Sequence, residues 1–345
     1  MSCGVRSGDF LKKEAQTPLH QLFLAAGVPC EIWTNSESIL EAARESFLPV
    51  DEPRPAVEFR MRFWVDPEDT SQAPWPKPHV RGLEHLVFAG FDIGSSALVD
   101  LRARRAIGRF SSRMGADRAY WTTVVFPMLL SIAGGSAGIA EIHCACVAKG
   151  QNGLLLVGRS GSGKSTLSVA LSQEGFGFLS DDRTYCSLRE GRLSAWGLPT
   201  QLKLRGDAAA WFPELRDEER TDTPSGEQVF RLQPEPRLGI NRIRGCEPRW
   251  LVFLERREGA EFHLSQMSSS TAAEMLEDGL LAELPATVEK QSQTIARLVE
   301  LPCWLLRYGS QPPQAVSREL AYRFHTESGD YALVQTSTNE SDKPA

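Results

Sequence analysis

The sequence predicts an α/β protein with about two domains. Its 345 residues exceed the length of one ordinary domain, which is about 100–200 residues, and a hydrophobic fraction of 41% is ordinary for a chain that folds around hydrophobic cores. From about Ala119 onward, helical and strand patterns alternate around a glycine-rich loop, as in α/β domains with a phosphate site. We expect a mixed α/β N-terminal domain over residues 1–118, an α/β domain over 119–324 and a polar tail over 325–345.

The first predicted domain contains both helical and strand patterns. Glu37–Ser46 predicts a helix, and Ala56–Val65 alternates apolar and polar side chains as a half-buried strand does. The proline-rich segment Ser71–His79 predicts a loop, and His85–Asp92 and Ser96–Leu101 predict short strands. No recognisable chemistry occurs in this half of the chain, so the sequence leaves its role open.

Charge and cysteine content exclude several classes of protein. Lys and Arg number 38 against 44 Asp and Glu, a net charge of −6, which argues against a nucleic-acid partner held by phosphate contacts. The seven cysteines include no Cys-x-x-Cys pair and predict reduced, mostly buried thiols. The first sixteen residues lack the apolar segment of a secretory signal, so we expect a cytoplasmic protein.

One uncharged stretch, Tyr120–Ala140, is long enough to cross a bilayer. Pro127 and Gly134 interrupt it, and it contains several Ser and Thr residues. A buried helix followed by a glycine-rich turn is therefore the better prediction, and we expect no membrane partner.

A glycine-rich loop between a strand and a helix indicates a bound nucleotide. The loop satisfies the pattern G-x-x-x-x-G-K-[ST], follows the apolar run Gly153–Val157, and precedes the helical pattern Ser165–Ser172. Glycines let backbone N–H groups surround a phosphate, and the helix N-terminus adds partial positive charge. Lys164 is expected to reach the β- and γ-phosphates and the Ser165 hydroxyl to bind Mg²⁺. The predicted nucleotide-binding residues are Gly158, Arg159, Ser160, Gly161, Ser162, Gly163, Lys164, Ser165 and Thr166.

Two adjacent acids follow the next predicted strand, Phe176–Ser180. Asp181 lies seventeen residues after Lys164, and the carboxyl end of such a strand lies beside the phosphate loop. As neighbours in an extended chain, Asp181 and Asp182 point to opposite sides, so one carboxylate could face the γ-phosphate and acceptor while the other faces the metal or supports the loop. A solvated turn is the alternative interpretation.

A histidine precedes the loop in a third predicted strand. Glu141–Val147 reads as this strand, with His143 on the same side as Ala145 and Val147. A lone histidine in a strand is more often a structural residue than a functional one.

Together, these three elements resemble the C-terminal catalytic domain of bacterial HPr kinase/phosphorylase. His143 precedes Gly158 by fifteen residues and Asp181 follows Lys164 by seventeen, spacings typical of that family, and the match covers residues 143–182. The resemblance implies a phosphoenolpyruvate-carboxykinase-like variant of the P-loop fold that uses ATP and Mg²⁺. It also implies transfer of the γ-phosphoryl group to a seryl hydroxyl of a protein.

The resemblance also implies roles for individual residues. Asp181 resembles the catalytic acid/base, and Lys164 and Ser165 the phosphate and magnesium groups. His143 resembles a polar partner near the transferred phosphate, and Asp182 a group that assists with metal and geometry.

The chain departs from the family pattern at two places. Thr166 stands where family members commonly carry Glu, and the downstream motif R-P-G-R-N is not found. By position, its nearest analogue is Leu301–Gly309, a predicted strand ending in glycine before a helix from about Gln314. We therefore expect a divergent kinase that acts on a small protein or peptide, with a small-molecule kinase and a non-catalytic ATP-binding regulatory protein as alternatives. The acceptor, the choice of ATP over another nucleotide, the reverse phosphorolysis and a homo-oligomer stay open.

Overall fold

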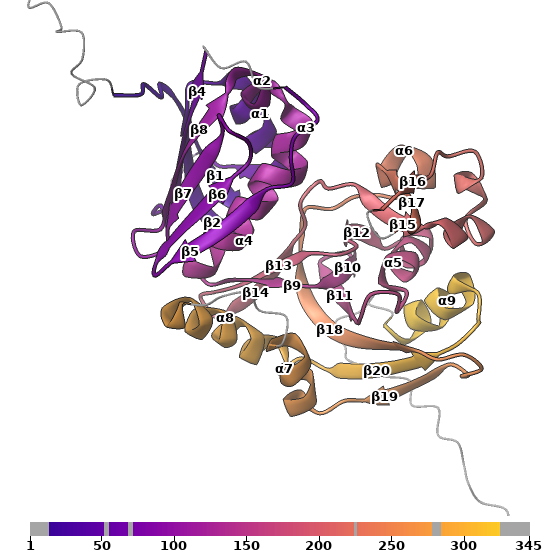
Figure 1. Cartoon of the computed structure of the whole chain (residues 1–345). Coiled ribbons are helices and arrows are strands. Elements are labelled where there is room, and N and C mark those ends of the chain that lie inside the picture. The colour runs from indigo at the N-terminus through magenta and orange to yellow at the C-terminus, as the bar shows by residue number, and fades with distance from the viewer. Residues whose placement is uncertain (1–13, 52–54, 68–71, 224–225, 278–283, 325–345) are drawn as a thin grey trace, which may run out of the picture. The chain divides into compact units, whose positions relative to one another are not determined.

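A computed structural model describes most of the chain and shows a mixed α/β protein (Figure 1). The residues described are 14–51, 55–67, 72–223, 226–277 and 284–324. The predicted polar tail, 325–345, lies outside them, as do the first thirteen residues, on which most of the signal-peptide prediction depends.

The described residues form two compact units, and each unit is built from three separate segments of the chain. The first unit takes its residues from 1–143, 183–201 and 268–301, and the second from 144–182, 202–267 and 302–345. The first unit therefore includes three segments that follow the predicted domain boundary at residue 118. Composition alone does not reveal that the chain passes back and forth between two units, because the membership of each segment depends on long-range strand pairing.

An eight-stranded sheet organises the first unit, with order β3-β1-β2-β4-β8-β7-β6-β5 among the described residues. Strands β2, β4 and β8 run parallel to one another, and the other neighbours are antiparallel. The predicted strand at Ala56–Val65 begins three residues later than expected. The strands are β1 (Leu19–Ala25), β2 (Val28–Thr34), β3 (Leu48–Pro49), β4 (Phe59–Asp66), β5 (His79–Leu83), β6 (Leu86–Gly90), β7 (Ser96–Asp100) and β8 (Arg105–Ser111).

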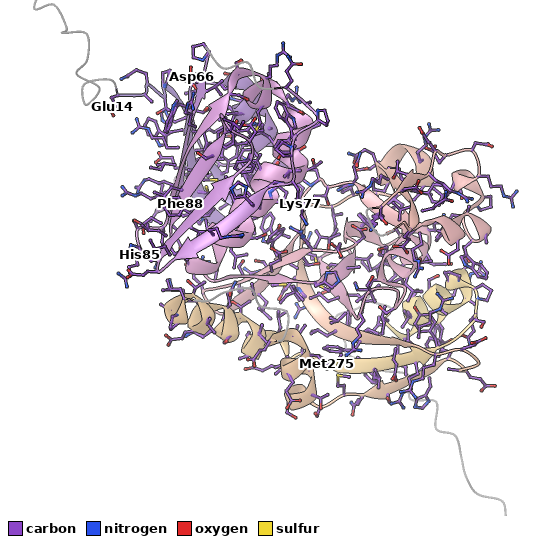
Figure 2. All side chains as sticks on the ribbon, viewed as in Figure 1. Glu14, Asp66, Lys77, His85, Phe88 and Met275 are labelled. Atoms are coloured by element: carbon purple, nitrogen blue, oxygen red, sulfur yellow. The ribbon has the colours of Figure 1, made fainter. Side chains whose placement is uncertain are left out.

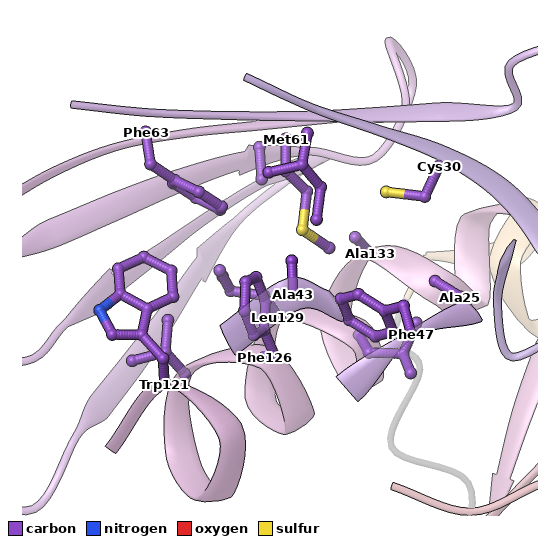
Figure 3. Packing of buried hydrophobic residues seen from close by; sticks show 14 of the residues in the cluster. Ala25, Cys30, Ala43, Phe47, Met61, Phe63, Trp121, Phe126, Leu129 and Ala133 are labelled. Carbon is purple, nitrogen blue, oxygen red and sulfur yellow. The ribbon is translucent and has the colours of Figure 1, made fainter. Parts of the chain in front are cut away.

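Helices cover one face of this sheet. They are α1 (Glu37–Ser46), α2 (Ser112–Ala116), α3 (Arg118–Tyr120), the π-helical turn η2 (Trp121–Val125) and α4 (Phe126–Ser136). In Figure 3, Met61 and Phe63 of the sheet face Trp121 and Phe126 of the helices, and the Phe63 and Trp121 rings are 5.2 Å apart. The opposite face carries the exposed side chains of the strands, such as Phe88 (Figure 2). This one-sided burial explains the alternation that the sequence shows.

Two local predictions in the first unit are confirmed. Helix α1 spans the predicted residues, and the Ser36 hydroxyl caps it by accepting a hydrogen bond from the amide of Ile39. The uncharged stretch forms a buried helix that ends in a turn at Gly138, whose φ is +82°. Among the described residues, no helix combines the length and apolarity needed to span a membrane.

The rest of the first unit surrounds a three-stranded antiparallel arrangement of β9 (Ile139–Ile142), β13 (Thr184–Arg189) and β14 (Arg192–Trp196). Helices α7 (Ser269–Glu277) and α8 (Pro285–Leu298) belong to the same unit. Gln291 of α8 donates a hydrogen bond to the Ile139 carbonyl at 3.1 Å, which holds α8 against β9.

The second unit contains the glycine-rich loop. Its strands are β10 (Cys144–Lys149), β11 (Asn152–Val157), β12 (Gly177–Ser180), β18 (Gly245–Arg256), β19 (His263–Gln266) and β20 (Cys303–Tyr308). They are ordered β12-β10-β11-β18-β20-β19, and the three neighbours β11, β18 and β20 are parallel. Helices α5 (Lys164–Gln173) and α9 (Pro313–Arg323) pack against each other, and they share a hydrophobic cluster with these strands.

A smaller sheet completes the second unit. Strands β15 (Leu202–Arg205), β17 (Gln228–Leu232) and β16 (Thr221–Asp222) pair in that order, all antiparallel. The short helices η3 (Gly206–Ala210), η4 (Pro213–Leu215) and α6 (Pro234–Leu238) accompany them. The sheet packs against α5 through β15, so it lies beside the helix that begins at the glycine-rich loop.

The cysteine prediction is confirmed for the described residues. Cys30, Cys144, Cys146, Cys186, Cys246 and Cys303 are all buried free thiols. Cys3 lies outside the described residues.

Candidate phosphate-binding site

The glycine-rich loop joins a central strand to a helix, as the sequence predicts. Strand β11 ends at Val157 and α5 begins at Lys164, so residues 158–163 form the connection. Because β11 pairs in parallel with β18, the loop leaves the carboxyl end of parallel strands, where α/β proteins commonly bind ligands.

Two glycines of the loop are required by its conformation. Gly161 has a φ of +81° and Gly163 a φ of +94°, in the left-handed region that favours glycine. A Cβ atom on Gly163 would lie only 2.1 Å from the Tyr308 hydroxyl oxygen, and that hydroxyl donates a hydrogen bond to the Ser162 carbonyl. No side chain caps α5 at Gly163, and the partial positive charge of a helix N-terminus suits an anion.

The lysine of the motif is folded back onto the loop. The Nζ atom of Lys164 donates to the carbonyl oxygens of Gly158 at 2.6 Å and Arg159 at 3.3 Å. Burial lowers the pKa of Lys164, whereas the negative charges of Asp182 and Asp181 raise it. Both carboxylates are therefore within electrostatic range of the loop lysine.

The two adjacent acids occupy different environments at the end of β12. Asp181 is only 5% exposed, and its Oδ2 accepts a hydrogen bond from the Lys203 amide at 3.1 Å. Burial raises the pKa of Asp181 from 3.8 to about 6, an effect that the Lys203 amide opposes and that the charge of Asp182 reinforces. Asp182 is exposed. The structure thus brings Lys164, Asp181 and Asp182 together and buries one acid while it leaves the other exposed.

The strand predicted over Glu141–Val147 is in fact parts of two strands, β9 and β10, because the chain bends at His143. Glu141 of β9 pairs with Tyr185, whereas Cys144 of β10 pairs with Val157, so the chain changes its pairing partners at this point. His143 is exposed and belongs to the first unit, whereas the loop belongs to the second. Its role beside a phosphate stays a prediction.

The residues at the loop suit a metal that arrives with a nucleotide. Within the described part of the chain, no group of three or more His, Cys, Asp or Glu side chains could hold a metal ion unaided. Mg²⁺ needs no such cage, since it usually keeps several waters and binds one or two carboxylates together with phosphates. Suitable oxygen ligands lie at the loop. Ser165 and Thr166 carry hydroxyls and are half-buried in the first turn of α5, and Asp182 carries a carboxylate and is exposed.

Sequence reasoning missed two residues of the site. Tyr308 is 4% exposed on β20 and contacts the loop, and burial raises its pKa to about 12. The sequence did predict the strand, the following Gly309 and the helix α9, but only the pairing of β20 with β18 shows where Tyr308 lies.

Arg242 is the second missed residue. It adjoins β12, and its charge lowers the pKa of Asp181. Its side chain is only 13% exposed, with Nε 2.7 Å from Glu235 Oε1 and the guanidinium over the Phe178 ring. No local motif marks it, because its relation to Asp181 depends on how the segment around Arg242 lies along β12.

The chain is similar to solved structures but matches no protein-family model and no curated protein sequence. A solved structure described as the HPr(Ser) kinase/phosphatase from Coxiella burnetii is similar at 12% sequence identity, with a TM-score of 0.29. The match covers 53% of this chain and 93% of that one. We therefore interpret the site from the contacts of its own residues.

Proposed function

We propose that this protein is an ATP-dependent kinase that transfers the γ-phosphoryl group to a hydroxyl, preferably of a serine, in a small protein or peptide. The observation that carries the proposal is the buried carboxylate of Asp181, with a pKa of about 6, near the lysine of a phosphate-binding loop. A carboxylate with this pKa is ionised at neutral pH and is a stronger base than an ordinary aspartate. The motif resemblance over residues 143–182 supports the same reaction class.

In the proposed reaction, the protein positions the reactants and neutralises charge. The loop amides and Lys164 bind the phosphates, and Ser165 and Asp182 hold Mg²⁺, which supplies positive charge to the phosphate oxygens. Asp181 accepts the proton of the acceptor hydroxyl as the acceptor oxygen forms a bond to the γ-phosphorus. The bond between that phosphorus and the bridging oxygen breaks, and ADP leaves.

A catalytic role explains Asp181 better than a purely binding role does. An ionised carboxylate that is 5% exposed costs folding free energy, and a protein that only binds ATP gains nothing from it. A small-molecule kinase remains the second candidate, because the site would perform the same chemistry on any hydroxyl. Cytoplasmic localisation and a homo-oligomer stay predictions.

Phosphate transfer from labelled ATP tests the proposal. Purified protein with Mg²⁺ and γ-labelled ATP should label a protein in a cell extract, and Asp181→Asn should reduce this labelling at least about a hundredfold while keeping nucleotide affinity. Asp217→Asn is the matched control, because it alters an exposed acid of the same unit.

Identification of the acceptor completes the test. Mass spectrometry of the proteins captured by Asp181→Asn should identify a partner that the unaltered enzyme phosphorylates. Equal labelling by Asp181→Asn would remove Asp181 from the mechanism. Label on a metabolite but on no protein would favour the small-molecule kinase.

A further inference from the structure

A second cationic side chain reaches the phosphate-binding loop from outside the motif. The Nη1 atom of Arg205 lies 3.4 Å from the position that a Cβ atom on Gly161 would occupy. Gly161 is exposed and has no side chain that could stand between the Arg205 guanidinium and the backbone of the loop. Arg205 belongs to β15, about forty residues after the loop in the sequence.

Strand β15 is anchored beside the buried acid of the site. The amide of Lys203 donates its hydrogen bond to Asp181, and Arg205 follows two residues later on the same side of the strand. Leu202 and Leu204 are buried on the other side, which fixes which side chains face outward. The strand that covers Asp181 therefore also carries a guanidinium to the loop.

Arg205 is held by a weak ion pair. Its Nε atom is 2.7 Å from Glu227 Oε1, and the two side chains are 62% and 36% exposed. Ion pairs this exposed contribute little stability. Arg242 differs, because it is 13% exposed and also packs over the Phe178 ring. Of these two arginines near the site, Arg205 is the one that can change partners at low cost.

We propose that Arg205 is a further catalytic residue, whose guanidinium leaves Glu227 and binds the terminal phosphate of ATP. This inference rests on the proposed kinase function. A planar guanidinium can donate two parallel hydrogen bonds to phosphate oxygens, and a nucleoside triphosphate carries more charge than the single carboxylate of Glu227. Arg205 then stabilises the charge on the γ-phosphoryl oxygens during transfer, and Glu227 holds the guanidinium when no nucleotide is bound.

Two measurements on the full chain test this role. The first is the affinity for ATP and for ADP, each with Mg²⁺, measured by titration calorimetry without an acceptor. Arg205→Ala should weaken ATP binding about tenfold and leave ADP binding within about twofold, because only ATP has the terminal phosphate. Glu227→Gln should strengthen ATP binding a few-fold, because Arg205 no longer has to break an ion pair before it binds the phosphate. If the Arg205–Glu227 pair were only structural, this gain would not occur.

The second measurement is kcat for phosphate transfer, with water as the acceptor if no protein is known. Arg205→Ala should lower kcat about 10²–10³-fold, and Arg205→Lys should recover part of the loss because it keeps the charge but not the planar fork. Arg318→Ala is the matched control, because it breaks a similarly exposed ion pair with Glu174 on the same unit and should change neither quantity.

The outcomes separate the two proposals. If Asp181→Asn abolishes transfer but Arg205→Ala keeps kcat within about threefold and binds ATP normally, Arg205 has no catalytic role and the kinase proposal stands. Absence of any nucleotide binding by the unaltered protein would overturn both proposals. Equal weakening of ADP and ATP binding in Arg205→Ala would show that Arg205 only supports the loop.

Discussion

Replacing Asp181 by Asn tests the electrostatics of the site, because the change removes a buried charge and nearly preserves the shape of the side chain. The asparagine oxygen can still accept the hydrogen bond from the Lys203 amide. Raising the pKa from 3.8 to about 6 makes the ionised form less favourable in the folded protein, by about 3 kcal/mol. The side chain is only 5% exposed, so solvent screens little of this cost.

This cost has a defined pH dependence. The pKa of Asp181 is higher in the folded protein than in the unfolded chain, so its contribution to stability is fully present below about pH 4 and is lost as the pH rises through about 6. Asparagine cannot ionise. Asp181→Asn should therefore increase the free energy of unfolding by about 3 kcal/mol at pH 7.5, by about half as much at pH 5 and by less than about 1 kcal/mol at pH 4.

Urea unfolding followed by tryptophan fluorescence measures this difference. The unaltered protein and Asp181→Asn are compared at pH 4, 5, 6 and 7.5. Asp217→Asn is the control for removal of an exposed acid, and we expect it to change the free energy of unfolding by less than about 0.5 kcal/mol at any pH. A variant that gains stability at pH 7.5 while losing transfer activity would show that the carboxylate is kept for function. A loss of stability at pH 7.5, or a gain that does not vary with pH, would refute the reasoning.

Three further predictions concern the same site. Lys164→Ala should weaken ATP binding at least about a hundredfold in titration calorimetry, because it removes the cation of the loop; unchanged affinity would exclude the loop as the phosphate site. The kcat/KM for transfer should fall about tenfold per pH unit below about pH 6, as Asp181 becomes protonated; a profile that stays flat to pH 5 would contradict its role as base. Tyr308→Phe removes the hydroxyl that donates to the Ser162 carbonyl, a contact worth about 1 kcal/mol, so ATP affinity should drop about fivefold while the folded structure, checked by circular dichroism, is retained.

The sequence predicted the parts of the site that depend on neighbouring residues. The strand before the loop, the helix after it and the strand that ends at Asp181 all match β11, α5 and β12 within one or two residues. Glycine positions, apolar runs and helical periodicity are local properties, so they can be recognised without knowing the fold.

The parts that failed depend on which strands pair. Nothing in Glu141–Val147 marks a break at His143, because both halves are extended. Only their different partners bend the chain there. Tyr308 and Arg242 lie far from the loop in the sequence. Tyr308 reaches the loop through β20, and Arg242 reaches the site by pairing with Phe178 of β12. Such contacts follow from register between distant strands, which a single sequence does not specify.

The different chemistry of the two adjacent acids follows from one of these distant strands. Alternation along an extended chain predicts that Asp181 and Asp182 point to opposite sides, but it does not predict which of the two side chains is buried. Strand β15 decides this, since the amide of Lys203 donates to Asp181, which is buried, while Asp182 is exposed. The hydrogen bond lowers the pKa of Asp181 and burial raises it by more, so the carboxylate has a pKa near 6 and is ionised at neutral pH. Because Arg205 lies on the same strand, any movement of β15 would displace both the amide that donates to Asp181 and the guanidinium beside Gly161. Under the proposed mechanism, such a movement would couple the activation of the acceptor to the binding of phosphate.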